Sequence, residues 1–301
     1  MTDLWILWEW PFDAPFVEAV ASSARAAGLS MTSIGPQEAR TALDRIRSMS
    51  RAPAVVLDRA SDVLPEAADI AILARRRGAV VLNDPDRVPA AVDKVRMHLA
   101  LMSVGVEVPW TVVAPALEDA PGWPRDQLPR IGAPFVIKPA HGAGGEGVVL
   151  DATREDDVDR ARAERPAEAH LLQEFIRTAE FGGRPAYFRA LYCLGEVHPC
   201  FWDPVTRHYA LPRPDDLAAS CFEGIAALAE AVARVAGMAL FSTEIAQSPD
   251  GRLVAVDYVN DMCDLRLASQ HPDGIPDAVV RDVARRIVQV AVEVARGRRG
   301  P

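Results

Sequence analysis

The chain has 301 residues, of which 50% are hydrophobic and 25% charged, with a formal net charge of −9. These totals are typical of a globular protein of two or three packed units. The acidic charge argues against a nucleic-acid partner, although it leaves room for a local basic pocket that binds a small phosphorylated ligand.

Four cysteines without a CxxC pair indicate reduced thiols and a cytoplasmic protein rather than a disulfide framework. No stretch of about 18 apolar residues indicates a membrane span. The first apolar run lies between Asp3 and Glu9 and has no basic residues before it, so we interpret it as a buried strand rather than a targeting signal.

The first 85 residues alternate short apolar runs with amphipathic segments. This alternation with short connections predicts a small parallel sheet with helices on its faces. The first strand-to-helix turn, residues 9–13, has no GxGxxG motif, so we expect a nucleotide to bind elsewhere. The predicted strands are Leu4–Trp8, Leu29–Ile34, Ala54–Leu57 and Ala79–Leu82, and the predicted helices are Ala14–Ala27, Gln37–Arg47 and Glu66–Arg77.

A second region is predicted to begin after Asn83-Asp84-Pro85. We expect one helix up to Gly105, with an apolar stripe at Val92, Val95, Leu99 and Met102, and then a proline-rich connection over residues 114–129. The remaining predicted strands are Pro134–Lys138, Gly147–Leu150, Leu171–Ile176, Arg189–Val197, Phe241–Ala246 and Leu253–Tyr258, and the remaining predicted helices are Asp216–Gly237 and Val279–Arg296.

Residues 135–148 are the most informative segment. A strand presents Lys138, and the loop that follows contains four glycines within six residues. Backbone N–H groups of such a loop can bind phosphate oxygens, while the lysine adds a compact positive charge. The pattern matches neither GxGxxG nor GxxxxGK[ST], so Rossmann and P-loop interpretations both fail. A flexible hairpin with an exposed lysine is the alternative.

Two carboxylates and an amide meet in the predicted C-terminal hairpin. Glu244 lies on one strand, and Asp257 and Asn260 lie at the end of its partner. Oxygen ligands of this kind suit Mg²⁺ or Mn²⁺ beside substrate phosphates. Solvent-facing carboxylates beside a turn are the alternative interpretation.

The order and spacing of these groups resemble the ATP-grasp superfamily, with glutathione-synthetase-like ligases, including ribosomal-protein glutamate ligases, as the most similar members. The resemblance covers about residues 83–267. It implies an α/β protein with an α+β ATP-grasp core preceded by a small Rossmann-like domain, divided at residues 1–85, 86–172 and 173–301. It also implies that ATP and Mg²⁺ are used to phosphorylate a small-molecule carboxylate, giving an acylphosphate that an amine attacks.

The resemblance assigns a role to each matching position. Arg189 and Lys138 would act on the transferred phosphoryl group, residues 174–176 would hold adenine, and Glu180 would bind the ribose. The positions implied for ATP are Lys94, Lys138, Gly142, Gly144, Gly145, Gly147, Gln173, Glu174, Phe175, Ile176 and Glu180, and those implied for the metal are Glu244, Asp257 and Asn260.

Three positions depart from the family pattern. The spacing Asp257-Tyr-Val-Asn260 is one residue longer than usual, so Asp261 is an alternative ligand. Glu244 stands where aspartate is commoner, and Tyr187 precedes the arginine where an acidic residue is more usual.

His141, inside the glycine loop, and Arg266, after the metal strand, are the candidate substrate residues. A guanidinium can pair with a substrate carboxylate through two hydrogen bonds. A salt bridge from Arg266 to Asp264 or Asp261 is an equal alternative.

Two other functions stay open. An inositol-phosphate-kinase-like enzyme shares the fold but needs several cations near its acceptor, and Arg207, Arg213 and Arg266 are a small supply. A degenerate nucleotide-binding regulatory protein is the other alternative. A homodimer is the default expectation for the assembly.

Overall fold

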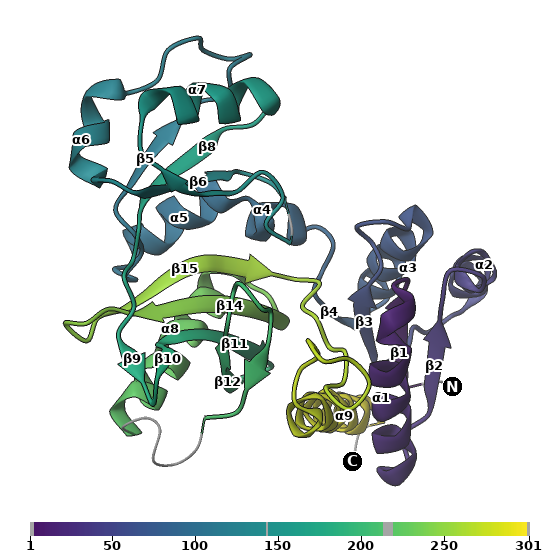
Figure 1. Cartoon of the computed structure of the whole chain (residues 1–301). Helices are drawn as coiled ribbons and strands as arrows, with labels where there is room; N and C mark the ends of the chain where they lie inside the picture. The colour runs from purple at the N-terminus through teal and green to yellow at the C-terminus, as the bar shows by residue number, and fades with distance from the viewer. Residues whose placement is uncertain (1–2, 143, 213–218, 300–301) are drawn as a thin grey trace.

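The computed structural model describes residues 3–142, 144–212 and 219–299. Figure 1 shows an N-terminal parallel sheet beside a larger antiparallel sheet, with a third, antiparallel sheet above them. The expected α/β class, with a small parallel sheet at the N-terminus, is therefore confirmed.

The N-terminal sheet has the strand order β2-β1-β3-β4, and all of its strands are parallel. Alternate residues of β1 enter different cores: Leu4 and Ile6 pack towards α1, whereas Trp5 and Leu7 pack towards α2 and α3. The elements are β1 (Leu4–Trp8), η1 (Pro11–Asp13), α1 (Ala14–Ala26), β2 (Met31–Ile34), α2 (Ala39–Ser48), β3 (Val55–Arg59), α3 (Pro65–Arg76) and β4 (Val80–Leu82).

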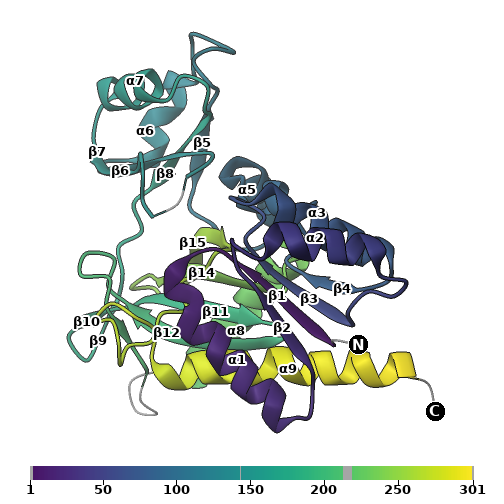
Figure 2. The same cartoon turned by 90° about the vertical axis from the view of Figure 1, so that its right-hand side faces the viewer.

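The helix α9 (Asp277–Arg299) lies between the N-terminal sheet and the larger antiparallel sheet (Figures 1 and 2). Its Val283 and Ile287 are fully buried in one core with residues from both sheets. A buried ion pair strengthens this junction, because Arg59 contacts Asp13 and also donates to the carbonyl of Cys263 at 3.1 Å. The N-terminal unit thereby holds the segment that follows the predicted metal strand.

The upper sheet has the strand order β5-β8-β6-β7 and is antiparallel. Its strands are β5 (Thr111–Ala114), β6 (Phe135–Pro139), β7 (Val149–Ala152) and β8 (His170–Glu174), and its helical segments are η2 (Arg125–Gln127), α6 (Leu128–Ile131) and α7 (Glu155–Glu164). The strand β5 and the helix α7 were not predicted from the sequence, and the proposed boundary at residue 172 falls inside β8.

The larger sheet has the strand order β13-β12-β11-β14-β15, with the helix α8 (Ala219–Ala236) packed on one face. Its strands are β11 (Tyr187–Cys193), β12 (Glu196–Trp202), β13 (Tyr209–Ala210), β14 (Leu240–Gln247) and β15 (Leu253–Asn260), and a small hairpin of β9 (Glu180–Phe181) and β10 (Arg184–Pro185) precedes them. The predicted strand Arg189–Val197 is confirmed as far as Cys193, where β11 ends, but is wrong beyond it, because the chain turns at Leu194 and Gly195, both with positive φ.

The single helix predicted after residue 85 is also wrong. Asp93 separates α4 (Val88–Val92) from α5 (Lys94–Ser103), and its side chain caps α5 by accepting from the backbone N–H of Arg96. Only part of the predicted apolar stripe packs on a core: Val95 does, whereas Leu99 and Met102 are 56% and 55% exposed. None of the helices in the described part of the chain is long and apolar enough to cross a membrane.

Candidate nucleotide and metal site

Three predicted site residues lie side by side across the larger sheet. Arg189 on β11 is paired with Glu244 on β14, and Glu244 is paired with Asp257 on β15. Directly paired residues of neighbouring antiparallel strands project from the same face. The fold therefore gathers a guanidinium and two carboxylates in one row, although they are far apart in the sequence.

The extra residue in the metal motif is absorbed by an irregularity of β15. Ser242 is paired with Asn260 and Glu244 with Asp257, so two residues of β14 are matched by three of β15. A bulge of this kind takes up one residue without ending the pairing. It leaves Asp257 and Asn260 both opposite same-face positions of β14.

Aromatic side chains hold Arg189 and Glu244 in place. The two residues form an ion pair, the Tyr187 hydroxyl donates to Glu244 Oε2 at 2.6 Å, and Arg189 donates to the Tyr209 hydroxyl at 3.1 Å. The Arg189 guanidinium also stacks 4.1 Å from the ring centroid of Trp202. These supports of Arg189 were not predicted from the sequence, although Tyr187 lies two residues before Arg189, on the same strand face.

Neighbouring charges and hydrogen bonds keep Glu244 and Arg189 ionised. Burial alone would raise the pKa of Glu244, but the charge of Arg189, hydrogen bonds from Tyr187 and Arg189, and the charge of Lys138 hold it below its usual value. Burial opposes the charge of Arg189, but Glu244 and Tyr209 outweigh it and raise the pKa of that guanidinium. Two carboxylates and an amide oxygen suit a hard cation such as Mg²⁺.

In residues 3–142, 144–212 and 219–299, no group of three or more His, Cys, Asp and Glu side chains is arranged to hold a metal ion. Asp261, the alternative ligand, is partly buried at the end of the motif, and burial raises the pKa of its carboxyl.

The chain contains only two lysines, Lys94 and Lys138, and both reach the same region. Lys138 on β6 donates to the carbonyl of Val256 at 2.5 Å, beside Asp257. Lys94 is the first residue of α5 and donates to the carbonyl of Gly142 at 2.7 Å. Burial lowers the pKa of Lys138, and the charges of Asp257 and Glu244 partly oppose this effect.

The predicted glycine loop lies against Lys94. Four of its glycines have positive φ, a conformation that other residues adopt at a cost: Gly142, Gly144, Gly145 and Gly147. Glu146 pairs with Arg165 at 2.5 Å, and Arg207 lies 3.5 Å from the carbonyl of Gly144. The loop is thus tethered by charged side chains from two neighbouring segments.

Gly147→Ala is expected to weaken MgATP binding roughly tenfold, because the new Cβ would combine strain at a φ of +74° with a 2.7 Å contact to Arg165 Nε. Gly145→Ala is the matched control, since it also has a positive φ but its Cβ meets nothing within 4 Å. Titration calorimetry with MgATP measures both. Equal losses in the two variants would show that backbone strain alone matters.

The predicted adenine segment follows β8, which ends at Glu174. Gln173 is buried, Glu174 exchanges hydrogen bonds with the backbone of Trp110, and Phe175 is half exposed. Ile176 packs on the core of the larger sheet. Glu180, the predicted ribose contact, lies exposed on β9.

The two predicted substrate residues have partners within the chain. His141 Nδ1 lies 2.9 Å from Glu168 Oε2. Arg266 pairs with Asp264 and Asp273, with closest approaches of 2.7 and 2.8 Å. The salt bridge that the sequence left open is therefore formed with Asp264, and the substrate roles stay predictions. Arg213 lies outside the described residues.

A buried polar cluster beside Lys138 was missed. The Tyr258 hydroxyl lies 2.6 Å from His98 Nδ1 and accepts from Gln173 Nε2 at 3.0 Å. Two signals in the sequence point to it: His98 lies one helical turn after Lys94, and Tyr258 lies inside the metal motif. We call His98, Gln173 and Tyr258 the Tyr258 cluster.

The free energy of unfolding is expected to fall by up to about 3 kcal/mol between pH 6.5 and pH 4 because of His98. Burial and the charge of Lys138 lower the pKa of His98 from 6.5 to about 4, so the unfolded chain binds more protons in this window. Urea unfolding of the wild type and of His98→Gln at several pH values measures the effect. The same pH dependence in both proteins would exclude His98 as its source.

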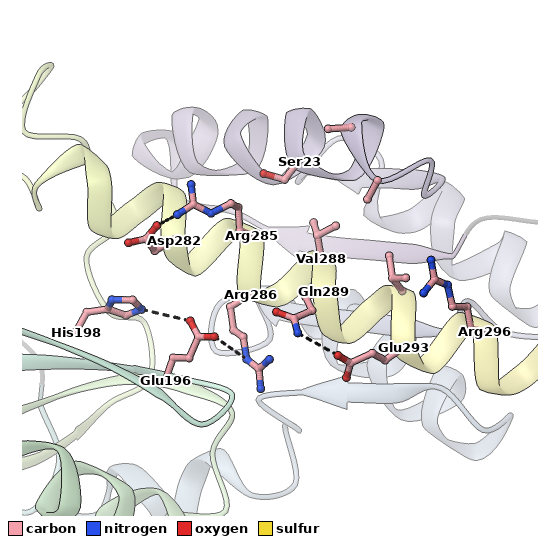
Figure 3. Close-up of a pocket in the computed structure, with 13 residues that line it drawn as sticks. Ser23, Glu196, His198, Asp282, Arg285, Arg286, Val288, Gln289, Glu293 and Arg296 are labelled. Carbon is pink, nitrogen blue, oxygen red and sulfur yellow. Dashed lines mark hydrogen bonds and ion pairs between the residues drawn. The ribbon is translucent and has the colours of Figure 1, made fainter. Parts of the chain in front are cut away.

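A groove of about 910 Å³ lies elsewhere, along α9 between α1 and β12 (Figure 3). Its charged side chains largely pair with one another: Asp282 with Arg285, and Glu196 with Arg286. His198 lines this groove rather than the lysine region. We therefore do not place the nucleotide there.

The chain resembles known proteins over its whole fold but over only part of its sequence. No family model matches the chain. The solved structure of a D-alanine–D-alanine ligase from Bacillus anthracis in complex with ATP has a TM-score of 0.67 at 12% identity, covering 99% of this chain and 100% of that one. The chain therefore has the ATP-grasp fold.

Two further proteins are similar to the chain, one in structure and one in sequence. The ATP-grasp ligase PsnB, solved with a minimal precursor, Mg and ADP, has a TM-score of 0.66 at 15% identity and covers 98% of this chain and 99% of its own. The ribosomal protein bS6–L-glutamate ligase of Escherichia coli K12 is 34% identical over 105 residues. That match spans 34% of each chain, about a third of the curated relative's length.

Proposed function

We propose that the chain is an ATP- and magnesium-dependent ligase that activates a carboxylate as an acylphosphate and joins it to an amine. The contact between Lys138 and the carbonyl of Val256 supports this most directly. It brings the lysine of the upper sheet to the strand that bears Asp257, so phosphate-binding and metal-binding groups face one space. The similar PsnB structure was solved with Mg and ADP, which supports the choice of ATP and magnesium as cofactors.

The proposed reaction has two steps. A carboxylate oxygen bonds to the γ-phosphorus of ATP, and the electron pair of the broken phosphorus–oxygen bond leaves with ADP. The amine nitrogen then attacks the acylphosphate carbon, phosphate departs, and the nitrogen loses a proton to give the amide. Mg²⁺, held by Glu244, Asp257 and Asn260, would neutralise phosphate charge when it is bound.

The side chains of this chain supply the remaining requirements. Arg189 would stabilise charge on the transferred phosphoryl group, while Lys94 and Lys138 would bind the phosphates of ATP. The loop of residues 142–147 would exclude water, which otherwise hydrolyses the acylphosphate. Trp202 and Tyr209 would keep the Arg189 guanidinium in one orientation through the contacts described above.

The substrates are proposed by chemical class alone. One is a carboxylate and the other an amine, and peptides belong in the test because PsnB has been solved with a precursor peptide and the bS6–L-glutamate ligase is named for a protein. ADP release would be measured with MgATP against pooled amino acids, peptides and polyamines, with inositol phosphates in separate wells. Turnover that requires a carboxylate and an amine together supports the ligase, whereas turnover on a hydroxyl acceptor alone identifies a kinase.

The two lysines allow a test that needs no substrate. An amine-selective acylating reagent can modify only Lys94, Lys138 and the N-terminal amine. MgATP is expected to protect both lysines, as measured by peptide mass spectrometry. Unchanged labelling of both lysines at saturating MgATP would contradict the proposed nucleotide site.

A further inference from the structure

The Tyr258 cluster lies where α5, β8 and β15 meet. His98, Gln173 and Tyr258 are 2%, 1% and 2% exposed, so the three polar side chains are almost completely buried. Gln173 also donates to Thr111 Oγ1 at 3.2 Å, which extends the cluster to β5. Buried polar groups cost free energy unless they are satisfied, and apolar side chains would fill this space without that cost. Packing alone therefore does not explain why these three buried residues are polar.

Each member is joined by the backbone to a different part of the proposed site. Gln173 immediately precedes the segment 174–176, and Tyr258 immediately follows Asp257. His98 lies one turn after Lys94 on α5. The hydroxyl of Tyr258 thus connects the proposed adenine segment, the metal strand and the helix that presents a phosphate-binding lysine.

The direction of the hydrogen bonds determines the protonation state of His98. The amide nitrogen of Gln173 can only donate, so the Tyr258 hydroxyl accepts from it and is left to donate to His98 Nδ1. This arrangement requires a neutral His98 with its proton on Nε2. The lowered pKa of His98 agrees with that form.

Tyr258 lies on the opposite strand face from Asp257, because neighbouring residues of a strand alternate. Its ring packs in the core that contains Met97, Leu101 and Leu171, from α5 and β8. The same residue pair therefore places a metal ligand on one face of β15 and an anchor to the upper sheet on the other. A small rotation of β15 would disturb both together.

We infer that Tyr258 is a positioning residue whose hydroxyl sets the place of the adenine segment relative to the metal strand. This inference rests on the proposed function, since it assumes that ATP binds between the two sheets. Tyr258→Phe is expected to weaken MgATP and MgADP binding roughly tenfold, the effect of losing one or two buried hydrogen bonds. Tyr192→Phe is the control, because the Tyr192 ring stacks on Phe241 and its hydroxyl makes no hydrogen bond within the described residues.

A second variant separates positioning from stability. Tyr258→Phe leaves His98 and Gln173 partly unsatisfied and is expected to lower Tm, whereas the triple variant His98→Leu/Gln173→Leu/Tyr258→Phe removes the unsatisfied groups and should recover most of the loss. If Tyr258 is a positioning residue, the triple variant is expected to bind nucleotide roughly tenfold more weakly than the wild type even though its Tm recovers.

Calorimetric titration with MgATP and MgADP, together with thermal unfolding, decides between the outcomes. Affinity that returns with Tm in the triple variant would overturn the inference and leave the cluster a structural element. Wild-type affinity in Tyr258→Phe would overturn it as well. Absence of nucleotide binding in the wild type would instead overturn the proposed function, and the inference with it.

Discussion

Lys138→Ala is expected to lower kcat/KM for ATP roughly 10²–10³-fold, the usual effect of removing one preorganised charge-stabilising donor. Lys138 is held beside β15 by its bond to Val256 and lies near the charges of Asp257 and Glu244. Its replacement removes a positive charge from the place where the phosphates are proposed to bind. ADP release and calorimetric MgATP binding measure the two parts of the effect.

Two further variants test whether the position or only the charge matters. Lys138→Arg keeps the charge but replaces a compact ammonium with a wider, planar group, and is expected to recover less than a tenth of the lost activity. Lys94→Ala removes the only other lysine and is expected to raise KM for ATP more than it lowers kcat. Full activity in Lys138→Ala would remove this residue from the mechanism and place the nucleotide elsewhere.

Arg189→Lys is expected to lower kcat roughly 100-fold while leaving KM for ATP within about threefold of the wild type. The Arg189 guanidinium contacts a carboxylate, a hydroxyl and an indole face together, and an ammonium cannot reproduce this planar geometry. The effect on kcat is expected because the group is proposed to act on charge that develops during phosphoryl transfer. Steady-state kinetics with saturating substrates measures it.

The free energy of unfolding of a second variant tests the role of Arg189 independently of the kinetics. Arg189→Met leaves the partly buried Glu244 without its ion pair and is expected to lower the free energy of unfolding by about 3 kcal/mol. Arg285→Lys is the control substitution, because Arg285 is largely exposed and pairs with Asp282 on α9, away from the proposed site. A rise in KM for ATP with unchanged kcat in Arg189→Lys would assign Arg189 to nucleotide binding rather than to phosphoryl transfer.

Local patterns in the sequence were sufficient for the N-terminal sheet, and they also pointed out the segments of the proposed site. Alternating apolar and amphipathic runs predicted β1 to β4 and the helices between them, because each element is encoded by its own periodicity. The glycine loop was recognisable because its backbone conformation requires glycine at several positions. The residues of the predicted metal motif were picked out by their order in the chain, and the hairpin of β14 and β15 brings them into register.

The errors have equally local causes. Lys94 was expected inside a continuous helix, but the preceding Asp93 ends α4 and caps α5, which moves the lysine to a helix start facing the glycine loop. The strand predicted through Leu194 and Gly195 ignored a turn that contains only one glycine. Periodicity does not register a break of one residue, and capping and turn chemistry decide such positions.

The sequence by itself determined which residue types were available for the proposed phosphate, metal and adenine contacts, and in what order they occur. Only the tertiary structure decided which of them meet. The pairing of Arg189 with Glu244, the absorption of one extra residue before Asn260, and the contact of Lys138 with Val256 all join segments distant in the chain. The Tyr258 cluster depends on the same packing of α5 and two sheets. Helix and strand periods describe neighbours along one element, whereas strand register and sheet packing set the distances between elements.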